Sequence, residues 1–301
     1  MAKSLGGLSM AATDTNDDAA PHGLILVGMG LGHVEGMTVA ALEAARKADH
    51  RRYEAYTALW PEEELNRLEG QIGPIQRVMR PEVEQPEALL KLAQNSTVAL
   101  LVVGDPLQAT THVDLQLQAQ EAGIPCEVVH GLSITTVVTG AVGLSNYKFG
   151  RQTTLTYPYG GWVATSPLET IISNDSQGMH TLALLDLDPT GMGTGDQRPM
   201  TPADASDAMR MMMEKMRSQL DDLPEEEAAP SSQLREAYKR YLNRSLSDIV
   251  VVLCSDMGTP DQRIVTTNMA ALRGVSGGRL NCLVFPGRTG EVEDNALLRW
   301  R

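Results

Sequence analysis

The sequence contains little cysteine, and this limits the kinds of protein that it can encode. Its 301 residues include three cysteines, which are odd in number, widely separated and outside any Cys-x-x-Cys pair: Cys126, Cys254 and Cys282. Such a pattern favours neither a disulfide framework nor a zinc site. We therefore expect no metal and a reducing, cytoplasmic location.

Long apolar runs are also missing. The runs at 24–27, 98–103 and 249–254 are far shorter than the ~20 residues that cross a bilayer. Residues 1–22 lack the continuous apolar core of a secretory signal, and we expect them to form a flexible N-terminal extension. The sequence thus predicts no membrane segment.

Basic residues are too few to balance the acidic ones. The 25 Lys and Arg residues against 38 Asp and Glu residues give a formal net charge of -13. Because nucleic-acid affinity depends largely on Lys and Arg that neutralise phosphates, this balance argues against a nucleic-acid partner. A solvated acidic surface explains the charge most simply, with a basic partner or a salt-adapted source as alternatives.

Several catalytic signatures are absent. Nothing matches the phosphate-binding GxxxxGK[ST] or the hydrolase GxSxG, and the six histidines never have HExxH spacing. The segment GMGLG at 28–32 begins like a dinucleotide-binding fingerprint, but His33 stands where its third glycine should be. These glycines still indicate a backbone that comes close to a ligand or to a neighbouring strand.

Strand and helix patterns alternate along the chain. In the first half, strands at 24–27, 98–103 and 126–129 alternate with helices near 38–48 and 113–122, which indicates βαβ units and a mainly parallel sheet. After residue 150, further strand patterns indicate a second α/β unit; they lie at 153–157, 181–187, 249–254 and 280–285.

These patterns predict an α/β fold class with two α/β domains. We place them at 23–135 and 136–301, because the glycine-rich segment 131–152 separates the two sets of patterns. In the second domain, the methionine-rich helix after Thr201 is expected to pack in a core, and 221–233 to form an exposed connector.

The run LLVVGDPLQATTH at 100–112 changes from a buried strand to a polar turn. Loops after the carboxyl ends of strands are the usual ligand sites of α/β proteins. Asp105 is interpreted as a ligand-binding residue, with a turn-organising acid as the alternative, since a carboxylate there needs partners. His112 and His130 are interpreted as capping or packing residues rather than catalysts.

Read together, several stretches resemble the diphthine synthase family of the tetrapyrrole methylase superfamily. They are GMGLG with MTVAALEAARKAD (28–49), YEAYTALW (53–60), VVGDPLQATTH (102–112), HGLSI followed by GLSNYKFG (130–150), GMHTLALLDLD (178–188), RPMTPADA (198–205), MGTPDQRI (257–264) and LNCLVFPG (280–287). The resemblance covers nearly all of 23–287, and the combination of GDPxxATTH, YKFG and HTLxLLD is much more specific than a glycine motif alone.

This resemblance implies an S-adenosyl-L-methionine-dependent methyltransferase. Its implied substrate is translation elongation factor 2, whose modified histidine receives successive methyl groups on the amino group of a 3-amino-3-carboxypropyl arm. The implied fold has tetrapyrrole-methylase type domains with the cofactor cleft between them, and the implied assembly is a homodimer. By motif position the cofactor contacts are Leu31, Asp105, Gln108, Ser133, Ile134, Leu185, Met257 and Asn281.

The chain departs from the family pattern at three places. The family commonly has an acid at the position of His33, HNASI in place of HGLSI, and a histidine at the position of Asn281. No catalytic acid or base is assigned. A small-molecule methyltransferase acting on a corrin or porphyrin precursor, and a non-catalytic S-adenosylmethionine-binding protein, are the alternatives.

Overall fold

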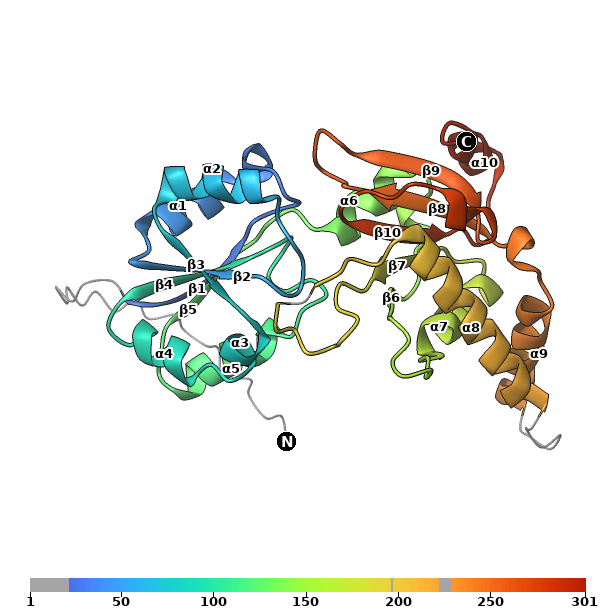
Figure 1. Cartoon of the computed structure of the whole chain (residues 1–301), viewed down its shortest axis with the longest axis horizontal. Helices are drawn as coiled ribbons and strands as arrows, with labels where there is room; N and C mark the ends of the chain where they lie inside the picture. The colour runs from blue at the N-terminus through green and yellow to red at the C-terminus, as the bar shows by residue number, and fades with distance from the viewer. Residues whose placement is uncertain (1–21, 196, 222–228) are drawn as a thin grey trace, which may run out of the picture.

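A computed structural model of the chain describes residues 22–195, 197–221 and 229–301. It has two lobes side by side, and each is built around one five-stranded sheet (Figure 1). The predicted pair of α/β units is confirmed. The predicted N-terminal extension, except for its last residue, lies outside the described residues.

The sheet of the first lobe is entirely parallel, as predicted, with the order β3-β2-β4-β1-β5. Its strands are β1 Gly23–Gly28, β2 His50–Glu54, β3 Ile75–Val78, β4 Thr97–Val102 and β5 Cys126–Val129. Helices cover both faces: α1 Val39–Lys47 and α2 Glu62–Ile72 lie on one, and α3 Arg80–Glu84, α4 Glu87–Ala93 and α5 His112–Glu121 on the other (Figure 1).

Burial on both faces explains the continuous apolar runs in this half of the sequence. In β1, Val27 packs under α1 and α2, whereas Leu24 and Leu26 pack toward α4 and α5. Parallel strands covered on both faces need apolar side chains at consecutive positions, so the run shows no alternation.

The sheet of the second lobe is mostly antiparallel, with the order β6-β7-β10-β8-β9 and one parallel pair, β6 with β7. The strands are β6 Thr153–Leu155, β7 Thr181–Leu185, β8 Val250–Ser255, β9 Arg263–Asn268 and β10 Asn281–Phe285. One face packs against α7 Ser166–Ser176, α8 Pro202–Asp221 and α9 Ala229–Leu242, and the other against α6 Ile134–Ala141 and α10 Glu291–Leu298.

The methionine-rich helix is α8, and its methionines pack in the core as predicted: Met209, Met212, Met213 and Met216 are all buried. Thr201 caps this helix, because its Oγ1 accepts the N–H of Asp204 while the Asp204 carboxylate accepts the N–H of Thr201.

The predicted connector at 221–233 needs a correction. Helix α9 begins at Ala229, so residues 229–233 are helical, and 222–228 lie outside the described residues. Pro230 stands in the first helical turn, where the N–H that proline lacks would have no helical partner. A proline there begins a helix and does not mark a loop.

The segment between the two sheets is α6. Its Val138 packs against Leu182 and Val252 of the second sheet. The predicted domain boundary between residues 135 and 136 falls near the start of this helix and stays a prediction.

In the ranges that the structure describes, every helix is too short or too polar to span a bilayer.

Candidate functional site

The carboxyl ends of β1 and β4 lie next to each other in the first sheet, and the chain leaves them toward opposite faces. After β1 it enters α1, whose Ala41 and Ala45 pack on one face; after β4 it enters α5, whose Leu115 and Ala119 pack on the other. Open α/β sheets bind their ligands in the crevice that such a divergence creates, so this edge of the sheet is the candidate site.

The loops after β4, β1 and β5 cross at this edge, and four glycines allow them to come close. We call these glycines the glycine crossing: Gly28, Gly30, Gly104 and Gly131. Gly30 and Gly104 donate backbone hydrogen bonds to each other, at 3.2 and 2.8 Å. A Cβ on Gly28 would lie 2.3 Å from the Gly131 nitrogen, and a Cβ on Gly131 would lie 2.3 Å from the Gly104 oxygen. The predicted close approach to a neighbouring strand is therefore confirmed.

Asp105 lies at the centre of the crossing and is 6% exposed. Its Oδ1 accepts the N–H of Leu107 at 2.9 Å, and its Oδ2 lies 2.8 Å from His130 Nδ1 and 3.3 Å from the N of Gly131. Gly104 beside it is buried, yet a Cβ on it would meet no other heavy atom within 4 Å. The carboxylate thus organises both loops next to an open hollow.

The structure brings three further predicted residues to the same edge. Ser133 is the N-cap of α6, with its Oγ accepting the N–H of Thr135, and Ile134 begins the helix. The Thr135 hydroxyl donates to Gln108 Oε1 at 3.4 Å, so the loop after β4 is joined to the start of α6.

Three predicted residues come from the second lobe: Met257, Asn281 and Leu185. Met257 is buried, and its neighbour Gly258 lies against Leu31: a Cβ on Gly258 would be 2.8 Å from Leu31 Cβ. Asn281 Oδ1 accepts from Ser255 Oγ at 2.7 Å and from the N–H of Gly278 at 2.8 Å. The loop that carries Met257 therefore contacts the loop after β1, and Asn281 holds the adjacent turn.

Leu185 is placed differently from the other predicted residues. It ends β7 and is 7% exposed, and it belongs to the core cluster that includes Leu155 and Leu168, on the sheet face covered by α7, α8 and α9. The described contacts do not join it to the glycine crossing. Its predicted role in cofactor binding stays a prediction.

His112 contacts the loop after β4 with a buried ring. The ring is buried, with Nδ1 2.9 Å from the Pro106 oxygen and Nε2 3.1 Å from Glu54 Oε2. Burial disfavours the charged ring, but the Glu54 carboxylate and the Pro106 carbonyl outweigh it and raise the pKa of His112. The contacts agree with the packing role that the sequence predicts for this histidine.

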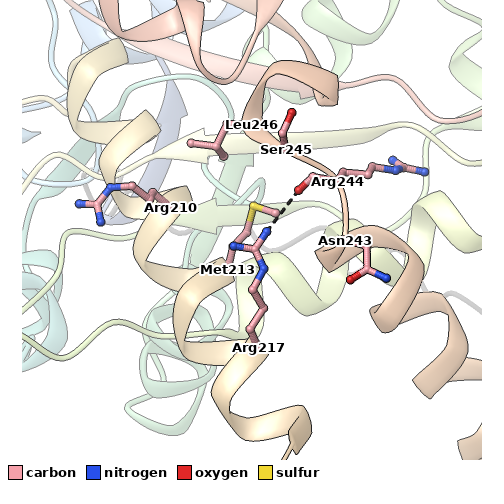
Figure 2. Close-up of a pocket in the computed structure, with 7 residues that line it drawn as sticks. All are labelled: Arg210, Met213, Arg217, Asn243, Arg244, Ser245 and Leu246. Carbon is pink, nitrogen blue, oxygen red and sulfur yellow. Dashed lines mark hydrogen bonds between the residues drawn. The ribbon is translucent and has the colours of Figure 1, made fainter.

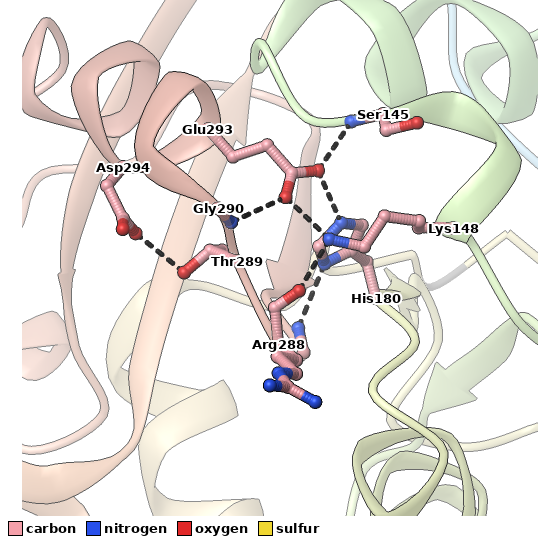
Figure 3. Close-up of polar contacts among 9 residues, drawn as sticks. Ser145, Lys148, His180, Arg288, Thr289, Gly290, Glu293 and Asp294 are labelled. Atoms are coloured by element: carbon pink, nitrogen blue, oxygen red, sulfur yellow. Dashed lines mark hydrogen bonds and ion pairs between the residues drawn. The ribbon is translucent and has the colours of Figure 1, made fainter.

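The YKFG and HTLxLLD motifs meet at a carboxylate of α10 (Figure 3). Glu293 accepts from Lys148 Nζ at 2.5 Å and from the N–H of Ser145 at 2.9 Å, and it lies 3.1 Å from His180 Nε2. The Gly287 N–H donates to His180 Nδ1, so this ring is neutral. These motif residues attach α10 to the second sheet and lie outside the crossing.

A group of possible metal ligands stands near the loop after β1. Ligand atoms of His33, Glu35 and Glu64 lie within 4.8 Å of one another. Arg67 pairs with both carboxylates, so its guanidinium already compensates one of their two charges. These contacts describe a surface ion-pair network.

A cavity of about 410 Å³ lies elsewhere, beside α8 and the turn after α9 (Figure 2). Its lining is Arg210, Met213, Arg217, Asn243, Arg244, Ser245 and Leu246. Arg217 donates to the Leu242 and Arg244 carbonyls, and Arg244 pairs with Asp175. The predicted site residues do not line this cavity.

Comparison with known proteins identifies the family. The model of the tetrapyrrole (corrin/porphyrin) methylases matches residues 23–273. The chain belongs to the tetrapyrrole methylase family. The predicted fold class is therefore confirmed, and the Rossmann dinucleotide interpretation of GMGLG is not supported.

Relatives of this tetrapyrrole methylase include diphthine synthases. The one from Methanospirillum hungatei is 37% identical over 166 residues, which span 54% of this chain and 66% of that protein, just under two thirds. The one from Halorubrum lacusprofundi is 32% identical over 281 residues, spanning 91% of this chain and 95% of that protein. The resemblance predicted from the motifs is confirmed.

Solved structures agree with the sequence comparisons. A crystal structure of diphthine synthase matches this methylase with a TM-score of 0.73 and 27% identity. The match spans 92% of this chain and 95% of the other. A putative diphthine synthase from Entamoeba histolytica gives a TM-score of 0.73 at 27% identity over 93% of this chain and 98% of the other.

Sequence reasoning missed two residues of the site. His130, which the sequence predicts to cap or pack, is 68% exposed at its side chain and pairs with Asp105. Thr135 bridges Ser133 and Gln108. The signal for His130 was its place directly after β5, on the same sheet edge as Asp105.

Proposed function

We propose that this chain is an S-adenosyl-L-methionine-dependent methyltransferase that methylates the modified histidine of translation elongation factor 2 to form diphthine. The methyl groups go to the amino group of the 3-amino-3-carboxypropyl arm. The match to a diphthine synthase over 95% of that protein's length is the observation that carries the proposal.

The crevice fits the proposed cofactor. The space beside Gly104 is open although the glycine is buried, and the predicted contacts Gln108 and Leu31 follow the same two strands, β4 and β1. Asp105, Ser133 and Ile134 would bind from the first lobe and the α6 start, and Met257 and Asn281 from the second lobe. The bound sulfonium supplies a methyl group already activated for transfer to a nucleophile.

The residues of the chain would then mainly orient and shield the reactants. A methyl transfer of this kind needs the amine lone pair aligned with the breaking bond and water kept away. Besides its proposed contact with the cofactor, the Asp105 carboxylate makes three contacts within the loops and so holds the crossing in shape. Leu31 meets Gly258, the neighbour of Met257, at a contact between the two lobes, and these residues would shield the reactants there.

The setting of the reaction belongs to the same proposal. We place the protein in the cytoplasm with its elongation-factor substrate, as a homodimer, without a nucleic-acid partner and without membrane attachment. The three free cysteines and the net charge of -13 support the compartment and the absence of nucleic acid. Light scattering during gel filtration tests the dimer, and a monomeric mass would contradict it.

The test is methyl transfer to the protein substrate. The purified chain is incubated with S-adenosylmethionine carrying a labelled methyl group and with elongation factor 2 that bears the unmethylated arm. We expect label on the factor, and none on a factor whose modified histidine is replaced. Label on a corrin or porphyrin precursor instead, or cofactor binding without any transfer, would contradict the proposal.

Asp105→Ala tests the site itself. The change leaves His130 and the N–H groups of Leu107 and Gly131 without their acceptor, so we expect at least ~10-fold weaker cofactor binding by calorimetry. Unchanged affinity would contradict the placement of the cofactor at the crossing.

A further inference from the structure

His130 and Asp105 form a carboxylate and imidazole pair at the carboxyl edge of the first sheet. They come from the ends of β5 and β4, which are separated by β1 and therefore stand about 10 Å apart in the sheet. The glycine crossing removes the side chains that would fill this space, since Gly131 lies directly on Gly28. The pair exists because the loops cross there.

The contact with Asp105 determines which ring nitrogen of His130 carries the proton. Asp105 Oδ2 is 2.8 Å from His130 Nδ1, and a carboxylate can only accept a hydrogen bond. Nδ1 therefore carries the proton, and the lone pair of the neutral ring is on Nε2. A carboxylate that orients a histidine through Nδ1 while Nε2 handles protons is a recurring arrangement of general bases.

Exposure differs sharply across the pair. The side chain of Asp105 is 8% exposed and that of His130 is 68% exposed. The carboxylate also accepts two backbone N–H groups, so it is held without help from the histidine. The imidazole is thus free to take a proton from a ligand in the crevice and to release it to water.

From this geometry we infer that His130 is the general base of the methyl transfer and that Asp105 is its positioning residue. The inference rests on the proposed function. An amine reaches the site as an ammonium ion, and His130 Nε2 takes one N–H proton from it. The nitrogen lone pair then forms the bond to the methyl carbon, and the pair of the broken carbon–sulfur bond stays on sulfur.

The proton balance extends to successive transfers. Each transfer makes the nitrogen positive again, so one proton must leave before each attack. The third methyl group gives a quaternary nitrogen that holds no proton, and the sequence ends. His130 returns each proton to solvent through its exposed edge, and a base of this kind is worth ~100-fold or more in rate.

A conservative variant separates a base from a structural support. His130→Asn keeps an N–H donor near the Nδ1 position for Asp105 but lacks the titratable Nε2. We expect kcat of methyl transfer to fall at least ~100-fold, the acidic limb of the pH profile to disappear, and cofactor affinity to stay within ~3-fold. The matched control, His22→Asn, changes an exposed histidine outside the crossing and should behave as the unchanged chain.

NMR on histidine-labelled protein gives a readout that does not involve turnover. The resonances lost in His130→Asn identify the ring, and we expect its neutral form to be protonated at Nδ1 and to lose this preference in Asp105→Asn. Protonation at Nε2 would overturn the inference, as would a normal kcat and pH profile in His130→Asn. Failure of the unchanged chain to methylate the factor would instead contradict the proposed function.

Discussion

Two residues of the family motifs contact a carboxylate of α10 and lie away from the candidate site. Lys148 and His180 lie in the most specific motifs, yet both meet Glu293 of α10. Burial raises the pKa of Glu293, but Lys148, the N–H groups of Ser145 and Gly290, and His180 outweigh it and lower it from 4.5 to about 2. The charged carboxylate is therefore the form that the folded state prefers.

A pH-dependent loss of stability follows for Glu293→Gln. The unchanged side chain stabilises the fold fully above its unfolded pKa, and this contribution is lost as the pH falls through 4.5 toward about 2. We expect the variant to be less stable by ~3 kcal/mol at pH 7, and the difference to shrink near pH 3. Urea unfolding at several pH values measures it, and a difference that does not change with pH would contradict the assignment.

At the scale of elements, the glycine crossing determines whether three loops can share one edge. Gly131→Ala would place a methyl group 2.3 Å from the Gly104 oxygen. We expect a loss of ~1–3 kcal/mol in stability and a marked loss of cofactor affinity, because the loops must separate. Thermal unfolding and calorimetry measure the two effects.

The control for that variant is Gly140→Ala, within α6. A Cβ on Gly140 would meet no heavy atom within 4 Å, so alanine should stabilise the helix by ~0.5–1 kcal/mol. If Gly131→Ala behaved like Gly140→Ala, the crossing would not have the close contacts described.

Strand predictions cover β1, β4, β5, β6, β7, β8 and β10. No prediction covers β2, β3 and β9, in which charged or amide side chains interrupt the apolar residues. The antiparallel pairing of the second sheet depends on contacts between distant strands, which periodicity does not encode. For the same reason Asp105 was recognised as a site residue while its partner His130 was not.

At the scale of the whole molecule, contacts between loops join the lobes. Gln197 Nε2 donates to the Ala55 carbonyl at 2.9 Å, and the Arg80 N–H donates to the Gly193 carbonyl at 3.2 Å. Gly258 of the second lobe also meets Leu31 of the first. In the proposed placement of the cofactor, the crevice would have walls from both lobes, and its width would depend on how closely these loops approach.

Gly258→Ala tests this dependence. Its Cβ would come within 2.8 Å of Leu31, so we expect ~10-fold weaker cofactor binding. Gly258 has φ +80°, and alanine there also strains the backbone. Gly123→Ala, at φ +69° with no heavy atom within 4 Å of its Cβ, carries the same strain without the clash and should bind normally. Equal affinities of the two variants would contradict a wall at this contact.

The glycine crossing also constrains how this chain can evolve. The space of a side chain at Gly28 is taken by the backbone of Gly131, so a larger residue at Gly28 requires the loop after β5 to move. Gly131 itself stands where the family commonly has asparagine, so the path of this loop and the residue at position 131 are expected to change together. Comparison of descendants should find Gly28 unchanged wherever the loop keeps its present path.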